Sequence, residues 1–271
     1  MRSPLLLLFM FFILVPVHAF GQGVPDAAPW QDHAAVGKLF AESGTTGTFV
    51  LYDPATGVFS GHNRERAATR FIPASTFKIP NTLIGLSIGA VSSVDDILPY
   101  GGKPQPYPAW EKDMGLREAI KISNVPVYQE LARRIGLERM REGVAALHYG
   151  NMEIGTVVDR FWLDGPLQIS AVEQTRFLAA LAMERLPVSS GIQKAVRAIL
   201  LVEEGDGWKL FAKTGTAART SPQTGWWVGW VENNGAIFSF ALNVDSNPAM
   251  GAGERIAFGK QCLAAMGLCR R

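Results

Sequence analysis

The chain has 271 residues, 48% of them apolar and only 18% charged, which is typical of a globular protein with a well-filled core and excludes a disordered chain. Its 26 Lys and Arg against 24 Asp and Glu leave a formal net charge of +2, which argues against a nucleic-acid partner or a basic membrane-binding surface.

The N-terminal segment has the pattern of a secretory signal peptide. One charge at Arg2 precedes an apolar run from Leu5 to Val17, which is followed by small residues. We therefore expect a signal peptide over residues 1–21, cleaved after about Ala19 or Gly21, and export of the mature chain to the periplasm. The apolar run is short for a membrane span and no other stretch approaches that length, so we expect no span in the mature form.

Strand and helix patterns then follow in blocks along the chain. Residues 47–63 read as two strands around a turn at 53–57. Helical spacing dominates from Ser75 to about Leu186; Gly136 is placed to end one helix, and Ser170 with Glu173 forms a capping box ahead of another. The last elements are three strands and an amphipathic helix, over residues 208–215, 225–232, 236–245 and 256–266.

This order predicts a mixed α/β fold, with a mostly antiparallel sheet, flanking terminal helices and an inserted all-helical subdomain. We expect residues 22–271 to form a single domain, with a sheet subdomain of 22–74 plus 190–271 and a helical subdomain of 75–189.

Two cysteines, Cys262 and Cys269, lie near the C-terminus. A continuous helix would hold them about 10 Å apart, too far for a bridge, whereas a turn at Gly267 would bring the chain back. An oxidising compartment permits a disulfide, so both states stay open.

The stretch "IPASTFKIPNTLIGL" places Ser75 three residues before Lys78, among apolar neighbours. At this spacing the two side chains share one face of a helical turn. Apolar surroundings disfavour an ammonium ion and lower its pKa, so Lys78 could act as the base that activates Ser75 as a nucleophile. The plainer alternative is a lysine whose stem packs while its ammonium reaches water.

Other nucleophile and metal patterns are weaker. His33, His62 and His148 form neither a triad signature nor a pair with zinc spacing, so we expect no metal. The segment "GLSIG" matches the esterase elbow around Ser87, but that elbow needs a strand, a sharp turn and a helix, and this segment reads as helix throughout.

Further motifs follow in a fixed order: Ser123-Asn124-Val125, Tyr149-Gly150-Asn151, the W-L-x-G-x-L-x-I-S segment from Trp162, Lys213-Thr214-Gly215 and "GWWVGWV". Each alone has an ordinary structural explanation, such as a helix cap, a core aromatic or a strand end. Together with Ser75-x-x-Lys78 they resemble the class D (oxacillinase-type) serine β-lactamases over essentially the whole mature chain, and the resemblance implies the fold shared by serine β-lactamases and penicillin-binding proteins.

The resemblance implies an enzyme that hydrolyses the β-lactam ring of penicillin-type antibiotics through an acyl-serine intermediate and so gives antibiotic resistance. Ser75 would be the nucleophile, and Lys78, carbamylated by CO2 to N6-carboxylysine, the general base; no other cofactor is implied. The remaining roles are Trp162 holding the carbamate, Ser123 passing a proton to the leaving nitrogen, the backbone N–H groups of Ser75 and Thr216 forming the oxyanion hole, Val125, Lys213, Thr214, Gly215 and Arg255 binding substrate, and Phe77, Leu163, Tyr149 and Asn151 lining the pocket.

An alternative is a penicillin-binding sensor or transpeptidase-like domain that is acylated without efficient turnover. A sensor would be expected to carry an N-terminal signalling region, whereas this chain shows only an export signal. Thr216 stands where the family often has a bulkier apolar residue, so the range of penicillins, cephalosporins and carbapenems stays open, as does a homodimer.

Overall fold

The computed structural model describes residues 29–246 and 248–269. The signal peptide predicted for residues 1–21 and its cleavage site lie outside these residues.

The centre of the molecule is a seven-stranded sheet with the order β1-β3-β2-β9-β8-β7-β6. Every neighbouring pair is antiparallel except β1 and β3, which are parallel, so the predicted mostly antiparallel α/β fold is confirmed. The strands are β1 (Trp30–Asp32), β2 (Gly47–Asp53), β3 (Val58–His62), β6 (Leu201–Gly205), β7 (Trp208–Ala217), β8 (Gln223–Asn233) and β9 (Ala236–Ser246). A separate pair of short strands, β4 (Arg70–Phe71) and β5 (Ile169–Ser170), ties two connecting segments together.

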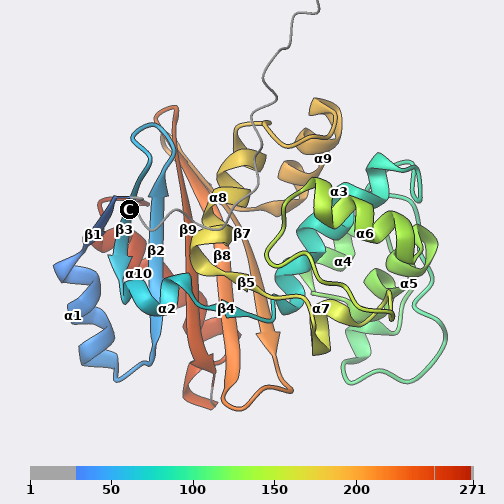
Figure 1. Ribbon diagram of the computed structural model, residues 1–271, viewed down its shortest axis with the longest axis horizontal. Helices are drawn as coiled ribbons and strands as arrows, with labels where there is room; N and C mark the ends of the chain where they lie inside the picture. Colours follow the sequence, from blue (N-terminus) through green and yellow to red (C-terminus); the bar gives the residue numbers. More distant parts are fainter. Residues whose placement is uncertain (1–28, 247, 270–271) are drawn as a thin grey trace, which may run out of the picture.

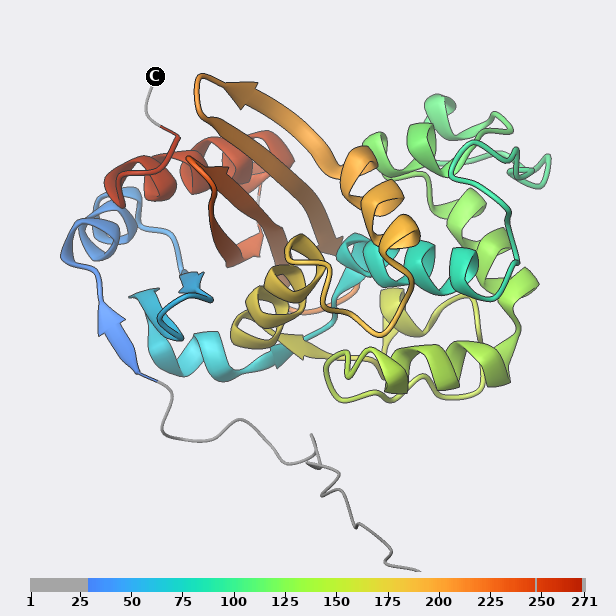
Figure 2. The same cartoon turned by 90° about the horizontal axis from the view of Figure 1, so that it is seen from above.

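Helices cover both faces of this sheet and gather at one side of it. Figure 2 shows α1 and α10 on one face and α8 on the other, and Figure 1 shows α3 to α7 grouped beyond β7. The helices are α1 (Ala34–Ser43), α2 (Arg64–Ala68), α3 (Lys78–Ser87), α4 (Leu116–Lys121), α5 (Val125–Ile135), α6 (Leu137–Ala146), α7 (Phe161–Asp164), α8 (Ala171–Ala182), α9 (Ser190–Leu200) and α10 (Ala252–Ala265), with 3₁₀ turns η1 (Ala74–Phe77), η2 (Pro108–Trp110) and η3 (Pro248–Met250).

Strand β8 explains why both faces need a cover. Trp226, Val228 and Trp230 belong to the core that α8 and the helical block share, whereas Trp227 and Val231 belong to the core under α1 and α10. Because successive side chains of a strand point to opposite faces, an uninterrupted apolar run predicts a strand buried on both sides. A Cβ on Gly259 of α10 would lie 2.1 Å from the Trp227 ring, so a glycine lets this helix approach the sheet.

The sequence patterns predicted the strongest elements. The strands β2 and β3 pair around the expected turn, α5 ends at Gly136, and α8 begins with the Ser170–Glu173 capping box. The predictions did not include α1, α9 or β6. Helix α8 packs on the sheet although its residues were assigned to the helical subdomain, and the subdomain boundaries stay a prediction.

Both cysteines are free thiols in the structure. Helix α10 ends at Ala265, and Gly267, with φ 85°, turns the chain back as expected. Burial raises the pKa of the Cys262 thiol to about 12 and that of Cys269 to about 11. Thiols with such pKa values carry little thiolate at neutral pH and react slowly.

We expect Ser170→Ala to lower the free energy of unfolding by about 1 kcal/mol, and the melting temperature by roughly 2–4 °C, because the reciprocal cap of α8 is lost. Both bonds of this capping box are present, at 3.1 and 2.9 Å. Ser189→Ala is the matched control, since that cap accepts one bond of 3.4 Å from Ile192 on an exposed helix end. Thermal denaturation of both variants checks this; equal shifts would contradict it.

Candidate active site

Ser75 lies in the 3₁₀ turn η1, directly before α3. The preceding residue, Ala74, has φ 49°, a left-handed conformation that costs a non-glycine residue about 1–2 kcal/mol. Strain of this kind persists only where the surrounding contacts enforce it, and it often marks a functional site. The Ser75 side chain is half-buried, so a small molecule can reach its hydroxyl.

Lys78 begins α3 and is fully buried. Its Nζ lies 2.9 Å from the Ser75 Oγ, within hydrogen-bond distance. Burial, and secondarily the charge of Lys213, holds the pKa of Lys78 well below its usual range. The plainer possibility of an ammonium reaching water is therefore wrong, because the amine is enclosed beside the serine hydroxyl and is easily neutral.

Aromatic rings pack beside Lys78 and around its neighbour Phe77. The Lys78 Nζ lies 5.2 Å from the centre of the Tyr128 ring. Phe77 stacks on Trp162 with ring centres 5.4 Å apart and meets Phe161 edge-on at 4.9 Å. Trp162 is fully buried, and its Nε1–H has no hydrogen-bond partner. A buried donor without a partner is costly, so this N–H is available to an acceptor.

Ser123 and Lys213 meet from opposite parts of the molecule. Lys213, on β7, donates from Nζ to the Ser123 Oγ at 2.5 Å and to its neighbour's carbonyl at 2.9 Å. Ser123 has φ 59° and stands before α5, whose N-cap is Asn124, accepting from the Val127 N–H. Ser123, the residue before this N-cap, is thus turned toward β7. Burial first, and then the charge of Arg255, lowers the pKa of Lys213 to about 7.

Strand β7 passes directly against the turn that carries Ser75. A Cβ on Gly215 would lie 3.0 Å from the Pro73 carbonyl oxygen and 3.2 Å from the Thr76 nitrogen, so a glycine allows this approach. Lys213–Thr216 lies at the end of a strand as expected, since β7 ends at Ala217 and pairs with β8 throughout. Continuation of the ladder holds this stretch rigidly beside η1.

Arg255, on α10, is almost fully buried beneath β8. Its guanidinium group reaches Thr216 at the end of β7. One Nη donates to the Thr216 hydroxyl at 2.8 Å, and the other to the Ser246 hydroxyl at 3.1 Å. Among the described residues, the hydrogen-bond partners of Lys78, Lys213 and Arg255 are all neutral groups. Lys213 and Arg255 are thus two buried basic side chains with no ion-paired carboxylate among the described residues, which favours an anionic ligand near them.

The other predicted residues lie around this centre. Val125 and Leu163 are half-buried, at the first turn of α5 and in α7. Tyr149 is fully buried and packs edge-on against Phe77, with ring centres 5.7 Å apart. The Asn151 side chain donates to the Pro166 carbonyl oxygen at 3.0 Å, so it tethers the loop that follows Trp162.

The structure argues against an esterase elbow at Ser87 and against a role for His62 at this site. Ser87 is the last residue of α3 and is exposed, so no strand-to-helix elbow carries it. His62 lies in β3 and stacks on Phe40 at the other end of the sheet. Over residues 29–246 and 248–269 no group of three or more His, Cys, Asp or Glu side chains is arranged to hold a metal ion.

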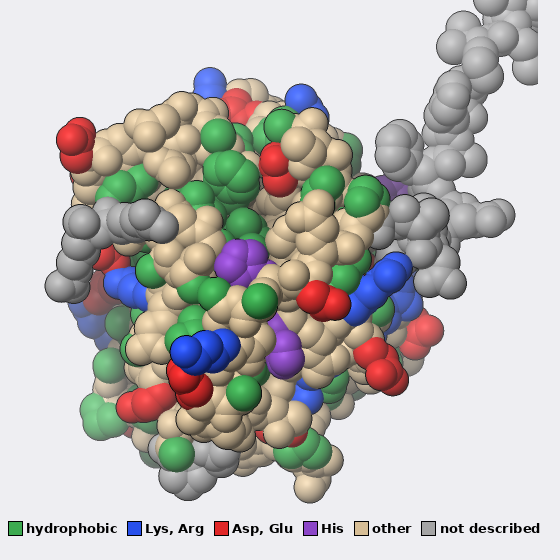
Figure 3. Space-filling model, turned by 90° about the vertical axis from the view of Figure 1, so that its left-hand side faces the viewer, with side chains coloured by type: hydrophobic (Ala, Val, Ile, Leu, Met, Phe, Trp, Pro, Cys, Tyr) green, Lys and Arg blue, Asp and Glu red, His purple; other side chains and the backbone are tan. Residues whose placement is uncertain are grey.

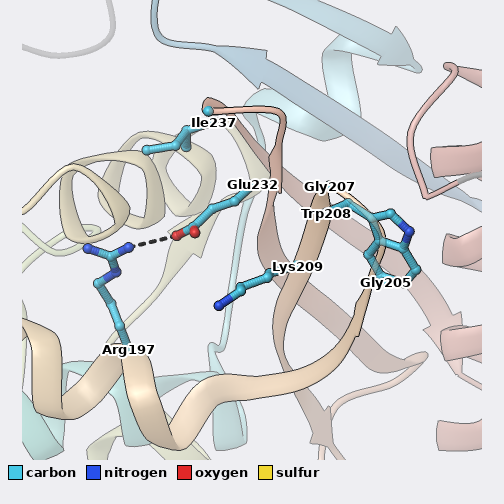
Figure 4. A pocket seen from close by; sticks show the side chains of 8 residues that line it. Arg197, Gly205, Gly207, Trp208, Lys209, Glu232 and Ile237 are labelled. Carbon is cyan, nitrogen blue, oxygen red and sulfur yellow. Dashed lines mark hydrogen bonds and ion pairs between the residues drawn. The ribbon is translucent and has the colours of Figure 1, made fainter.

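A cavity of about 330 Å³ lies away from Ser75, between α9 and the turns joining β6 to β7 and β8 to β9. Figure 4 shows the Arg197–Glu232 ion pair at its wall, where the two side chains meet at 2.7 Å. Arg197 also pairs with Glu184, so its charge is already neutralised. It contains none of the predicted site residues.

Comparisons with known proteins decide the family. Residues 47–263 match a family model described as the penicillin binding protein transpeptidase domain. β-Lactamase OXA-48 of Klebsiella pneumoniae is 40% identical over 242 residues, which are 89% of this chain and 91% of the relative. β-Lactamase OXA-5 of Pseudomonas aeruginosa is 38% identical over 263 residues, 96% of both chains. The crystal structure of FUS-1 (OXA-85), a class D β-lactamase from Fusobacterium nucleatum subsp. polymorphum, is 42% identical with a TM-score of 0.83, over 86% of this chain and 97% of that one.

The chain belongs to the class D β-lactamases. It is therefore a hydrolase of the fold that this family shares with penicillin-binding proteins.

Sequence patterns missed several residues that support the site of this class D enzyme. Tyr128, Thr76 and Gln174 are fully buried beside the motif residues. Tyr128 could be noticed as the residue three after Val125, on the same face of α5. Thr76 and Gln174 carry no sequence signal, because their contact joins two segments 98 residues apart.

The face of the class D enzyme at the α1 and β1 end is mixed in charge. Figure 3 shows, at the α1 and β1 end, Lys and Arg interspersed with Asp and Glu and scattered apolar groups. None of the described helices is long and apolar enough to cross a membrane.

Proposed function

We propose that this enzyme hydrolyses β-lactam antibiotics of the penicillin type by acylation and deacylation of Ser75, and so confers resistance. The observation that carries the proposal is the 2.9 Å approach of the Ser75 Oγ to a fully buried, easily neutral Lys78. A serine hydroxyl becomes nucleophilic when a neighbouring base takes its proton. The family named above supports the choice of substrate.

The acylation step uses the roles predicted for these residues. Ser75 attacks the lactam carbonyl carbon while its proton passes to the Lys78 side chain. The backbone N–H groups of Ser75 and Thr216 stabilise the oxyanion, and each such donor is typically worth about 3 kcal/mol. The lactam C–N bond breaks, and its nitrogen takes a proton through Ser123, which Lys213 holds at 2.5 Å.

The Lys78 surroundings fit a carbamate on its amine. Carbamylation by CO2 requires a neutral amine, and burial supplies it. The unpartnered Nε1–H of Trp162 is a donor suited to a carboxylate oxygen, and the flanking Phe77 ring excludes water. When present, this group would supply an anionic oxygen base for acylation and for the deacylating water. Trp162 would hold it, and Val125 and Leu163 would shield it.

Lys213 and Arg255, two basic residues of the site, recognise the substrate. Penicillins carry a carboxylate, and Lys213 and Arg255 are buried cations whose described partners are neutral. Thr214 and Gly215 lie on β7 between them, where the strand backbone faces η1. Charge-assisted bonds to a carboxylate are about twice as strong as neutral ones, so these residues set the affinity.

The test is purified protein mixed with a chromogenic cephalosporin. Steady release of many product equivalents per protein supports hydrolysis. A single stoichiometric burst would instead identify a slowly deacylating penicillin-binding sensor or transpeptidase-like domain, and no release at all would overturn the acyl-serine proposal.

We expect penicillin affinity to fall as the pH rises above about 7. Lys213 has a pKa of about 7, lowered by burial and by Arg255, so the free enzyme loses this cation above that pH. The bound carboxylate stabilises the protonated lysine, so binding takes up a proton and weakens by up to about tenfold per pH unit. The dissociation constant of a Ser75→Ala protein for a penicillin, measured from pH 6 to 9, checks this without turnover. In the same Ser75→Ala background, Lys213→Arg keeps its charge and should remove the pH dependence; a constant that does not change with pH while Lys213 is present would contradict the expectation.

We further propose that the chain is exported to the periplasm after cleavage near residue 19 or 21, and that sheet and helical subdomains form one catalytic domain over residues 22–271. The sequence of the first residues supports the export signal. Mass spectrometry of the protein recovered from a periplasmic extract tests the cleavage site. Light scattering of the same preparation distinguishes a monomer from a homodimer.

A further inference from the structure

A chain of buried hydrogen bonds runs from α8 to the turn that carries Ser75. Gln174, on α8, donates from Nε2 to the Thr76 hydroxyl at 2.9 Å, and that hydroxyl donates to the Pro73 carbonyl oxygen at 2.7 Å. The Tyr149 hydroxyl donates to the Gln174 Oε1 at 3.4 Å. Thr76 and Gln174 are fully buried, so water cannot substitute for either partner.

The Pro73 carbonyl closes the turn around Ala74 and Ser75. The backbone N–H of Thr76 also donates to it, at 3.2 Å. Ala74, inside this turn, has the left-handed φ of 49°. Two bonds from Thr76 to one carbonyl oxygen supply the constraint that such a conformation needs.

The same turn is the contact with β7. The position of a Cβ on Gly215 would lie 3.0 Å from the Pro73 carbonyl oxygen and 3.2 Å from the Thr76 nitrogen. Movement of this carbonyl would therefore change the gap between Ser75 and the strand that carries Thr216. That gap is where the two oxyanion donors must converge.

We propose that Gln174 is a positioning residue for acyl transfer, because its amide N–H directs the Thr76 hydroxyl proton to the Pro73 carbonyl and so sets Ser75 against β7. This rests on the proposed acyl-serine function. A hydroxyl has one proton, and the neighbour that donates to its lone pair leaves that proton free for a second acceptor. Gln174 itself touches neither the substrate nor the reacting atoms.

The experiment measures the rate at which a fluorescent penicillin labels Ser75. Gln174→Met keeps the side-chain length and removes the amide, so labelling should slow about tenfold, a typical effect of slightly misplaced reacting groups. Thr76→Val removes the hydroxyl, and in that background Gln174→Met should cost no further loss, because the pathway is already broken. Thr175→Val is the control: Thr175 is equally buried on the same helix, its hydroxyl donates only to the Val172 carbonyl within that helix, and the variant should label at the wild-type rate.

Gln174→Glu adds a signature that a packing role would not show. A protonated carboxyl can donate to Thr76, whereas the carboxylate can only accept and would compete for the hydroxyl proton. Its labelling rate relative to wild type should therefore fall between pH 6 and 9. The response of turnover to bicarbonate should stay that of the wild type, since Lys78 is untouched.

Three results would overturn the proposal: wild-type labelling by Gln174→Met, the same loss from Gln174→Met with and without Thr76, or a Gln174→Glu rate ratio that is constant with pH. Failure of the wild-type protein itself to be labelled would instead overturn the acyl-serine function. Failure of the positioning proposal thus appears in the Gln174 variants, whereas failure of the acyl-serine function appears in the wild-type protein.

Discussion

Ser75→Ala should abolish penicillin hydrolysis, with a loss on the order of 10⁶-fold, as when the nucleophile of another serine hydrolase is removed. No other hydroxyl can take its place. Among the described residues, the Ser75 Oγ, at 2.9 Å, is the hydroxyl that is hydrogen-bonded to the Lys78 amine. Steady-state turnover of a chromogenic cephalosporin measures the loss of hydrolysis. Mass spectrometry then checks that no acyl adduct forms at another hydroxyl.

Ser87→Ala is the matched control for this loss. Ser87 is the exposed last residue of α3, twelve positions after Ser75 and on the same helical segment. Its removal should leave turnover within about twofold of wild type, since surface substitutions rarely disturb a fold. The reverse pattern, an active Ser75→Ala and an inactive Ser87→Ala, would end the assignment of the nucleophile.

Trp162→Phe should make turnover dependent on added bicarbonate. The phenyl ring preserves the stack on Phe77, but the buried, unpartnered Nε1–H is lost. A hydrogen bond to a charged group is worth about 1.5–3 kcal/mol, so carbamate occupancy should fall roughly 10- to 100-fold. Activity titrated with bicarbonate, and the carbamate signal from labelled bicarbonate in carbon NMR, measure this directly.

Acid should act in the same direction as this substitution. Protonation of the Lys78 amine removes the nucleophile that captures CO2, so turnover falls as pH falls and recovers with bicarbonate. Lys78→Ala should acylate slowly and scarcely deacylate at any bicarbonate level. Trp230→Phe, which loses an indole bond of 3.3 Å to Glu232 on the remote part of β8, should keep the wild-type response. A Trp162→Phe protein indifferent to bicarbonate would argue against the carbamate.

Residue patterns predicted most of the elements that carry a long apolar face, either as a helical period or as an uninterrupted strand. In α5 the apolar residues Val127, Leu131 and Ile135 are all buried, and Gly136 ends the helix as its spacing indicates. Helix α1 buries only Val36 and Phe40 among its ten residues, so its apolar period is too sparse to detect. Local spacing thus reports an element only when its buried face is long enough.

The site residues also differ in how far they could be predicted from local sequence. Ser75 and Lys78 could be paired from sequence because they lie three positions apart in one turn. The contact of Ser123 with Lys213 joins residues 90 positions apart and depends on how the helical block meets the sheet. The free Nε1–H of Trp162 is a property of what surrounds it in space, and no local pattern of residues carries that information.

The bond between Ser123 and Lys213 also has a consequence for how the enzyme fails on heating. It spans the seam between the helical block and β7, so a slight slip of one against the other separates a proton relay from its cation while both parts keep their secondary structure. Partial openings of this kind cost less free energy than global unfolding. Reversible loss of turnover should therefore set in at temperatures where the circular dichroism is still native, which makes catalysis the more sensitive gauge of how the two halves fit.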